Sequence, residues 1–351
     1  MSPDSGLIVD EIQILEPTEP LANDLLAPEE TPSGESHQRS FAAAKKRLGN
    51  LILPLLGIAG FLLVWAIIAP RINTRVGSLP GPVEVFDAGR DLFDEWMATR
   101  EARAEFFANQ DANNAAAVAA GTPELVQNFE FNGPPSFPQQ IWTSLQTVAL
   151  GFLIGSVVAI PVGLLSGLSP SFMKAINPLV SIFKPVSPLA WLPIVQIVIA
   201  ATALDPDSYF APAFVISALV VTLNSLWPTL INTAVGASSV DEDLLNVGKV
   251  LKLGWFARLR KLVLPSALPY IFTGLRLSLG VGWMVLIAAE MLAQNPGLGK
   301  FVWDEFQNGS SNSLGRIMVA VLVIGVIGFL LDRMMLSLQR WTAYDQTAQI
   351  R

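Results

Sequence analysis

Long, almost uncharged stretches of apolar residues restrict the fold of this chain more than any other feature. Six of them approach or exceed the roughly 20 residues that a helix needs to cross a bilayer. They are Leu51–Ala69, Ile141–Gly167, Val186–Leu204, Ser208–Ile231, Pro269–Ala289 and Gly315–Leu331. Backbone groups inside a bilayer must pair within their own segment, so these stretches predict an all-α, polytopic membrane protein with about six transmembrane helices. Only 15% of the residues are charged, whereas about a quarter are charged in soluble domains.

Residues 1–50 differ in character from the rest of the chain. They hold nine acidic and four basic residues and no apolar periodicity, a composition typical of disordered segments. The first apolar stretch begins too far along the chain for a cleavable secretory signal. We therefore expect a disordered acidic tail at 1–50, a transmembrane helix at 51–69, an external loop at 70–140, a five-helix core at 141–341 with a cytoplasmic loop at 232–266, and a C-terminal cytoplasmic tail at 342–351.

Charged residues are distributed unevenly among the connecting segments. Basic residues occur at 44–47, at Lys174, at five positions within 249–261, and at Arg333 and Arg340, whereas the alternate loops are acidic. Cytoplasmic loops of membrane proteins carry the excess of Lys and Arg. Six crossings with this pattern predict that both termini and the loop at 232–266 are cytoplasmic.

The external segment 71–140 carries aromatic residues among acidic and basic ones, for example Phe86, Trp96 and Phe106. This pattern predicts short helices lying along the outer membrane surface. Two interpretations fit it equally: a lid that shields the transmembrane helices, and a docking surface for an external partner.

The cytoplasmic loop contains an amphipathic stretch, Ser239–Pro265. Ser239 with Glu242 forms a capping-box sequence that predicts the start of a helix, and Gly254 is a residue type that ends helices in a left-handed conformation. Acidic residues precede basic ones, as the helix dipole favours. Apolar residues recur at helical spacing, at positions 244, 245, 247, 250 and 251. We expect a helix on the membrane surface that a protein outside the membrane grips.

Small residues and prolines mark the second and third apolar stretches. The small residues recur at every fourth position, at Gly151, Gly155, Ala159, Gly163 and Gly167. This spacing favours close helix packing over the lining of a passage. The prolines are Pro161, Pro185, Pro188 and Pro193, and they predict kinked or broken helices.

The sequence contains no pattern of catalytic or metal-binding residues. It has no cysteine, its one histidine (His37) lies in the polar tail, and neither HExxH nor GxSxG occurs. The segment Pro296–Phe301 lacks the first glycine and the Ser or Thr of a Walker A loop. We therefore predict that the chain is not an enzyme, holds no cofactor of its own and binds no nucleic acid.

The cytoplasmic loop resembles the signature loop of permease subunits of ATP-binding-cassette importers. That signature reads Glu-Ala-Ala, three residues, Gly, nine residues, Ile-x-Leu-Pro. Here the ending is Leu262-Val263-Leu264-Pro265, Lys252 stands at the glycine position, and Asn246-Val247-Gly248 stand at Glu-Ala-Ala. The glutamate and the glycine are therefore replaced, while the spacing and the ending are kept.

Further segments are similar to one branch of that family, the nitrate, sulfonate (taurine) and bicarbonate permeases. They are Leu79–Pro82, Pro185–Pro193, Pro265–Pro269, Thr273–Arg276 and Ala288–Leu292, within residues 50–341, and Phe301–Asn308 is most similar to nitrate permeases. The resemblance implies a type I importer bundle with a cytoplasmic coupling helix in the bacterial inner membrane. It also implies transport of a small anion: nitrate or nitrite first, with sulfonate or taurine, bicarbonate and cyanate as alternatives.

The same resemblance implies partners. Two permease copies, a homodimer surrounded by membrane lipid, form the pathway. Two cytosolic ATPase subunits bind ATP and Mg²⁺, and a periplasmic or lipid-anchored binding protein delivers the substrate. The residues implied to couple to the ATPases are Asp241, Glu242, Leu244, Leu245, Asn246, Gly248, Lys249, Lys252, Gly254 and Trp255.

Three charged residues lie within or beside apolar stretches, namely Lys184, Arg276 and Glu290. Charges at such positions are costly and mark pairing or functional sites, so all three are candidates for the substrate pathway. For Arg276, pairing or snorkelling is favoured over attraction of an anion. Glu290 is expected to form structural hydrogen bonds, and Lys184 is expected at the interface.

Two interpretations from other classes remain open: a membrane scaffold that recruits a soluble protein, and a polytopic membrane enzyme. The enzyme would need a catalytic cluster near a membrane face. Co-purification of an ATPase pair whose activity is coupled to uptake distinguishes an importer from both.

Overall fold

The computed structural model describes residues 52–348 except 75–76, 203, 206–207 and 209. The expected tail at 1–50 and the last three residues lie outside the described residues. The chain divides into two units, Met1–Leu63 and Val64–Arg351. Within its described part, the first unit holds the beginning of an apolar helix, Ile52–Arg71, which is long enough to cross a membrane.

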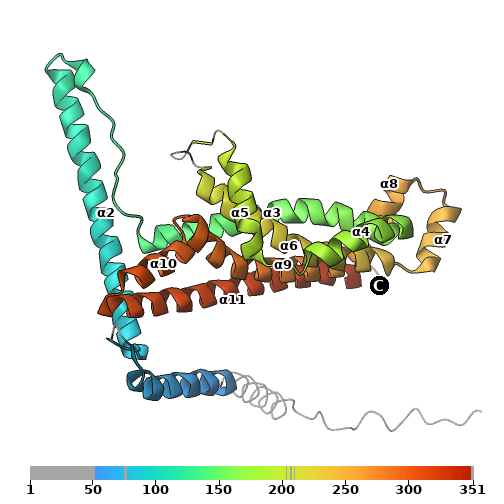
Figure 1. The fold of residues 1–351 in the computed structure, drawn as a ribbon. Coiled ribbons are helices and arrows are strands. Elements are labelled where there is room, and N and C mark those ends of the chain that lie inside the picture. The colour runs from blue at the N-terminus through green and yellow to red at the C-terminus, as the bar shows by residue number, and fades with distance from the viewer. Residues whose placement is uncertain (1–51, 75–76, 203, 206–207, 209, 349–351) are drawn as a thin grey trace, which may run out of the picture. The chain divides into compact units, whose positions relative to one another are not determined.

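The second unit is almost entirely helical (Figure 1). It begins within the helix Ile52–Arg71, which ends in a short 3-10 turn, η1 (Ala69–Arg71), and an antiparallel pair of two-residue strands follows. The remaining elements are, in chain order, β1 (Asn73–Thr74), β2 (Gly77–Ser78), α2 (Pro82–Ala119), η2 (Pro123–Leu125), α3 (Phe137–Leu168), α4 (Pro170–Phe183), α5 (Pro188–Ala200), α6 (Pro212–Ser238), α7 (Glu242–Val250), α8 (Trp255–Arg258), the π-helix η3 (Leu259–Val263), α9 (Leu264–Ala293), α10 (Leu298–Asn308) and α11 (Ser311–Ala348).

The third apolar stretch, Val186–Leu204, does not form one straight helix, and this confirms the break that its prolines predict. Two shorter helices, α4 and α5, are present instead, and their axes bend by 99° at the break between them. Pro185 and Pro188 lie at this break. Proline lacks an N–H and disfavours helical geometry in the residue before it, so the helix ends here and a new one begins.

The helices define two ends of the bundle. At the end that carries α7 and α8, the α7 end, Leu168 of α3 packs against the cluster that contains Ala237 of α6. At the end that carries α10, the α10 end, Ser144 of α3 bonds to Glu290 of α9. Ile216, near the start of α6, packs with the last turns of α5 and α9 and is therefore also at the α10 end. Because α3 finishes at one end and α6 starts at the other, α4 and α5 together cross the bundle once.

Small residues bring α3, α6 and α9 into close contact, as their spacing predicts. A Cβ atom added at Gly151 would lie 2.5 Å from the carbonyl oxygen of Ala218, and one at Gly163 would lie 2.7 Å from that of Leu230. The main hydrophobic cluster lies between these helices, α10 and α11, and its buried members are Val148, Val221, Leu279, Trp283, Leu286, Leu298 and Met335.

The external segment forms one helix of 38 residues, α2, so the expectation of short helices is wrong. The reason is that 83–119 contains no proline, one glycine and an alanine-rich second half, so nothing interrupts the helix. Leu92 anchors α2 on Phe301 and Ala320 at the α10 end. Beyond this contact α2 continues away from the bundle, and the chain returns beside it (Figure 1), where Asn114 bonds to the backbone of Gln127.

Candidate functional site: the coupling segment and the charged groups of the bundle

The start of α7 differs from the expected capping box. Ser239 ends α6, and its hydroxyl donates to the carbonyl of Gly236 at 3.1 Å. Asp241 is the N-cap instead, and its carboxylate accepts from the backbone N–H of Asp243 at 2.9 Å. Glu242 and Asp243 lie in the first turn and Lys249 in the last, the distribution that the helix dipole favours.

The end of α7 also differs from expectation. Lys252 adopts the left-handed conformation with φ 50°, while Gly254 has φ −62° and begins α8. The N–H of Leu253 donates to the carbonyl of Gly248 at 3.0 Å and closes the turn. The expected role of Gly254 as a helix end is therefore wrong. Lys252 occupies the left-handed position that ends α7, with backbone strain that a glycine would avoid.

One face of α7 is fixed to the bundle. Leu245 packs on the cluster of Ala237, Val240 and Val263. Gly248 is buried, and a Cβ atom there would lie 2.8 Å from the side chain of Leu262. These contacts hold α7 against η3 and the end of α6, so a force on α7 acts on the transmembrane helices directly.

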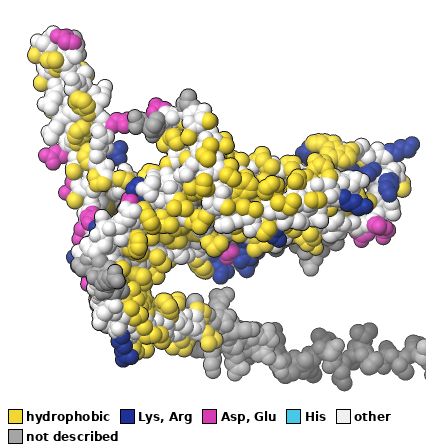
Figure 2. Space-filling view, in the orientation of Figure 1, with side chains coloured by type: hydrophobic (Ala, Val, Ile, Leu, Met, Phe, Trp, Pro, Cys, Tyr) yellow, Lys and Arg dark blue, Asp and Glu magenta, His cyan; other side chains and the backbone are white. Residues whose placement is uncertain are grey.

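The other face of α7 and the adjoining α8 expose apolar side chains. They are Leu244 (43% exposed), Val247 (51%), Val250 (81%), Leu251 (64%), Trp255 (60%) and Phe256 (68%). Asp241, Glu242, Asn246 and Lys249 border this surface, and Lys249 donates to Asn246 at 3.1 Å. Figure 2 shows basic side chains gathered at this end of the bundle and acidic ones along α2. Apolar surface of this extent, rimmed by polar groups, is typical of a protein contact.

Glu290 is fully buried at the α10 end. Its carboxylate lies 2.8 and 2.9 Å from the hydroxyl of Ser144 and accepts from the backbone N–H of Gly299 at 3.0 Å. The N–H of Leu298 donates to the same hydroxyl at 2.9 Å. Glu290 and Ser144 thus cap the first turn of α10 and join it to α3 and α9. With no exposed surface, Glu290 contacts no passage in this conformation.

Arg276 forms an ion pair with Asp332 of α11 through two hydrogen bonds, 2.6 Å from Nε to Oδ1 and 2.9 Å from Nη2 to Oδ2. Lys184 caps the C-terminal end of α4 and is exposed. The structure therefore does not bring together the three charges singled out in the sequence. The sequence also gave no sign of Asp332 as a partner, because it follows the last apolar stretch 56 positions away from Arg276.

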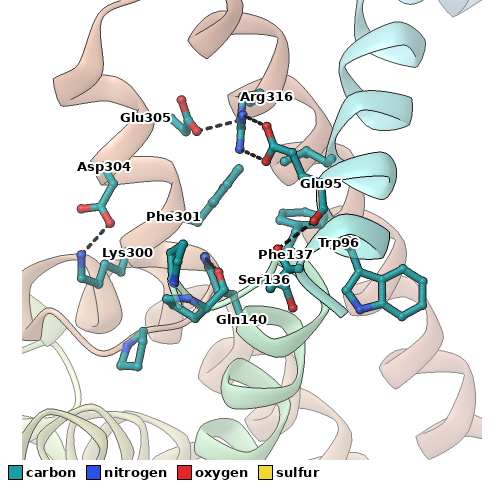
Figure 3. Close-up of a pocket in the computed structure, with 15 residues that line it drawn as sticks. Glu95, Trp96, Ser136, Phe137, Gln140, Lys300, Phe301, Asp304, Glu305 and Arg316 are labelled. Carbon is teal, nitrogen blue, oxygen red and sulfur yellow. Dashed lines mark hydrogen bonds and ion pairs between the residues drawn. The ribbon is translucent and has the colours of Figure 1, made fainter. Parts of the chain in front are cut away.

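A further cavity of about 420 Å³ lies at the α10 end between α2, α3, α10 and α11 (Figure 3). Arg316 lies 2.7 Å from Glu95 and 2.8 Å from Glu305, and so it ties α11 to α2 and α10. Lys300 pairs with Asp304 at 2.5 Å. Each charged group drawn in the cavity thus lies beside an opposite charge.

Known proteins are similar to this chain in sequence and in fold. The family described as "Binding-protein-dependent transport system inner membrane component" matches residues 159–344, which include α7. The bicarbonate transport system permease protein CmpB of Synechococcus elongatus is 36% identical over 298 residues, 85% of this chain and 91% of that protein. The nitrate import permease protein NrtB of the same species is 32% identical over 276 residues, 78% and 83% of the two chains.

Among solved structures, an inward-facing form of the MetNI methionine ABC transporter superposes with a TM-score of 0.50 and 13% identity, over 58% of this chain and 95% of the matched chain. At this identity the likeness concerns the fold alone. It agrees with the bundle of membrane-spanning helices described above. The chain therefore belongs to the family of binding-protein-dependent transport system inner membrane components, in the branch that contains the bicarbonate and nitrate permeases.

Proposed function

We propose that this chain is the transmembrane subunit of an ATP-driven importer of a small oxyanion, nitrate (or nitrite) or bicarbonate. The observation that carries the proposal is α7, a helix fixed to the bundle by Leu245 and Gly248 and exposing an apolar face on its other side. The names of the relatives support the choice of anion, since they include a bicarbonate and a nitrate permease. Sulfonate, taurine and cyanate are the alternatives.

The partners follow from this role. Two cytosolic ATPase subunits would bind ATP and Mg²⁺, and each would seat one α7 helix on its surface. A second copy of this chain would complete the pathway, and a periplasmic or lipid-anchored binding protein would deliver the anion at the α10 end. Movement of the ATPases would then turn α7 and, through its contacts with η3 and α6, open the bundle at one end and close it at the other.

The orientation belongs to the same proposal. The α7 end carries the basic residues of 249–261 and would face the cytoplasm of a bacterium under the positive-inside rule. Six crossings, with Ile52–Arg71 as the first, would put both termini on that side of the inner membrane.

The test is Val250→Asp, a charge placed on the most exposed apolar position of α7. An unpaired carboxylate in an apolar contact is costly, so we expect the variant to insert normally but to lose the co-purifying ATPase subunits and the uptake of labelled nitrate and bicarbonate. Leu245 is a poorer choice for this test, because it faces the bundle rather than a partner.

Val118→Asp is the matched control, since Val118 is also an exposed valine (60%) but lies at the far end of α2. We expect it to keep the ATPases. Retention of the ATPases and of uptake by Val250→Asp would contradict the proposal. ATPases that stay bound to the wild-type protein without any anion uptake would indicate a scaffold instead.

A further inference from the structure

Arg276 and Asp332 form a charged pair in a part of the bundle that should face lipid if the chain acted alone. Arg276 lies near the middle of α9 (Leu264–Ala293), and both residues belong to helices apolar enough to cross a membrane. Their side chains are 38% and 39% exposed. Charged groups at this depth face a water-filled cavity or another protein rather than lipid tails. We therefore expect this face of α9 and α11 to border a water-filled space or another protein, rather than lipid, in the assembled importer.

The pair lies in a groove of about 590 Å³ between α9 and α11, lined by Thr273, Arg276, Leu277, Gly280, Val281, Met284, Asp332 and Gln339. Its polar groups gather toward the α7 end, where Gln339 donates to Thr273 at 3.1 Å. Toward the α10 end the lining becomes apolar, with Leu277 52% and Met284 71% exposed. The groove is thus a polar strip that starts at the α7 end, reaches the ion pair and stops at apolar side chains.

The guanidinium of Arg276 is only partly used. Asp332 occupies the edge formed by Nε and Nη2. Among the described residues no group accepts from Nη1, and Nη1 is not among the buried unpaired atoms, so it is accessible. A guanidinium has five N–H donors in one plane. The edge formed by Nη1 and the second N–H of Nη2 is therefore left for another ligand with two coplanar oxygens.

We propose that Arg276 binds the transported anion, a small planar oxyanion, through this free edge, and that Asp332 is the positioning residue of the site. The inference rests on the proposed importer function. Asp332 holds the guanidinium plane in place and keeps the pair neutral when no anion is bound. Its negative charge also weakens the attraction for the anion, so that the anion leaves after binding.

The experiment uses the complex of this chain with its ATPase subunits, and the double variant Arg276→Gln with Asp332→Asn, which removes both charges together. We expect it to assemble as the wild type does, yet to lose uptake of nitrate and bicarbonate by about tenfold or more, the loss expected for one charge-assisted contact. Arg276→Lys should lose uptake similarly, because an ammonium lacks the planar edge. Lys300→Gln with Asp304→Asn, a neutralised ion pair on α10, is the matched control and should keep uptake.

A second readout is the thermal stability of the same complex, without binding protein, as a function of added anion. Nitrate or bicarbonate should raise the unfolding temperature of the wild type. Chloride at equal ionic strength should raise it less, because a monatomic ion has no pair of coplanar oxygens for the guanidinium edge. The double variant should not respond. Asp332→Asn should respond at a several-fold lower anion concentration while its uptake slows.

Wild-type uptake by the double variant would overturn the inference, because a purely structural pair can be replaced by two neutral residues. An equal response to chloride and nitrate would also overturn it. If the wild-type complex transports neither anion, the proposed function fails instead, so the two failures are distinguishable.

Discussion

Two charged residues of α9 are accommodated in opposite ways. Glu290 is enclosed completely and receives hydrogen bonds from neutral donors, the hydroxyl of Ser144 and the backbone of Gly299. Arg276 is paired with an opposite charge and keeps accessible surface. An enclosed group that accepts hydrogen bonds at both of its oxygens stabilises the fold, whereas a paired group with unused donors is able to take a ligand. The first arrangement is structural and the second is open to a substrate.

This difference predicts the effect of removing Glu290. Glu290→Ala leaves the buried N–H of Gly299 without an acceptor, which costs about 1–3 kcal/mol for each group so affected. Glu290→Gln keeps one acceptor oxygen, so its free energy of unfolding should fall by less than that of Glu290→Ala. The measurement is thermal unfolding of the purified protein in detergent, with exposed Glu130→Ala as the control. An unfolding temperature of Glu290→Ala equal to that of the wild type would show that the cap on α10 contributes nothing.

The sequence identified these charges but not their partners. Arg276 and Glu290 stand out because they interrupt or border apolar stretches, and the structural hydrogen bonds that we expect for Glu290 are present. Ser144 lies 146 positions from Glu290, and Asp332 lies 56 positions from Arg276. Such pairs depend on which helices pack together and in which rotation, and no local pattern contains that information.

At the scale of elements, local signals predicted the existence of helices better than their limits. The apolar stripe predicted a helix at α7, but two capping sites compete at its start. The hydroxyl of Ser239 donates to the carbonyl of Gly236, so Ser239 is the C-cap of α6 and Asp241 is the N-cap of α7. The break between α4 and α5 followed from prolines, whereas its 99° bend depends on packing against α6 and α9.

The contact between α3 and α6 gives a prediction at this scale. Gly163→Ala places a Cβ atom 2.7 Å from the carbonyl oxygen of Leu230 and from Thr233. Backbone atoms of a packed helix cannot move aside without further destabilisation. We therefore expect the free energy of unfolding to fall by about 1–3 kcal/mol, the usual effect of overpacking. Gly325→Ala in α11 meets nothing within 4 Å and serves as the control. Equal unfolding temperatures of the two variants in detergent would show that α3 and α6 do not need this close approach.

At the scale of the whole molecule, the path of the chain connects α7 to the groove of Arg276 and Asp332. The α7 end carries the fixed helix with its apolar face, and the polar strip starts at that same end. At the α10 end, the Glu290 cap joins α10 to α3 and α9. A rotation transmitted through α7 would reach α9 by way of η3, which continues directly into it. The groove of Arg276 and Asp332 would therefore change shape when α7 moves, and in the proposed importer this change would link ATP-driven motion to release of the anion.

This arrangement works only if the two ends of the bundle face opposite sides of the membrane, with α7 inside. The chain contains no cysteine. A single introduced cysteine is therefore the only thiol of this chain that can be labelled, and its reaction shows on which side of the membrane it lies. We expect Lys261→Cys, beside α7, and Ser5→Cys, in the N-terminal tail, to react with a membrane-impermeant maleimide only after the cells are opened. Val118→Cys at the end of α2 should react in intact cells. Labelling of Lys261→Cys in intact cells would place α7 outside, where no ATPase could reach it. If Ser5→Cys but not Lys261→Cys were labelled in intact cells, Ile52–Arg71 would not cross the membrane. The remaining part of the chain would then keep its orientation with five crossings.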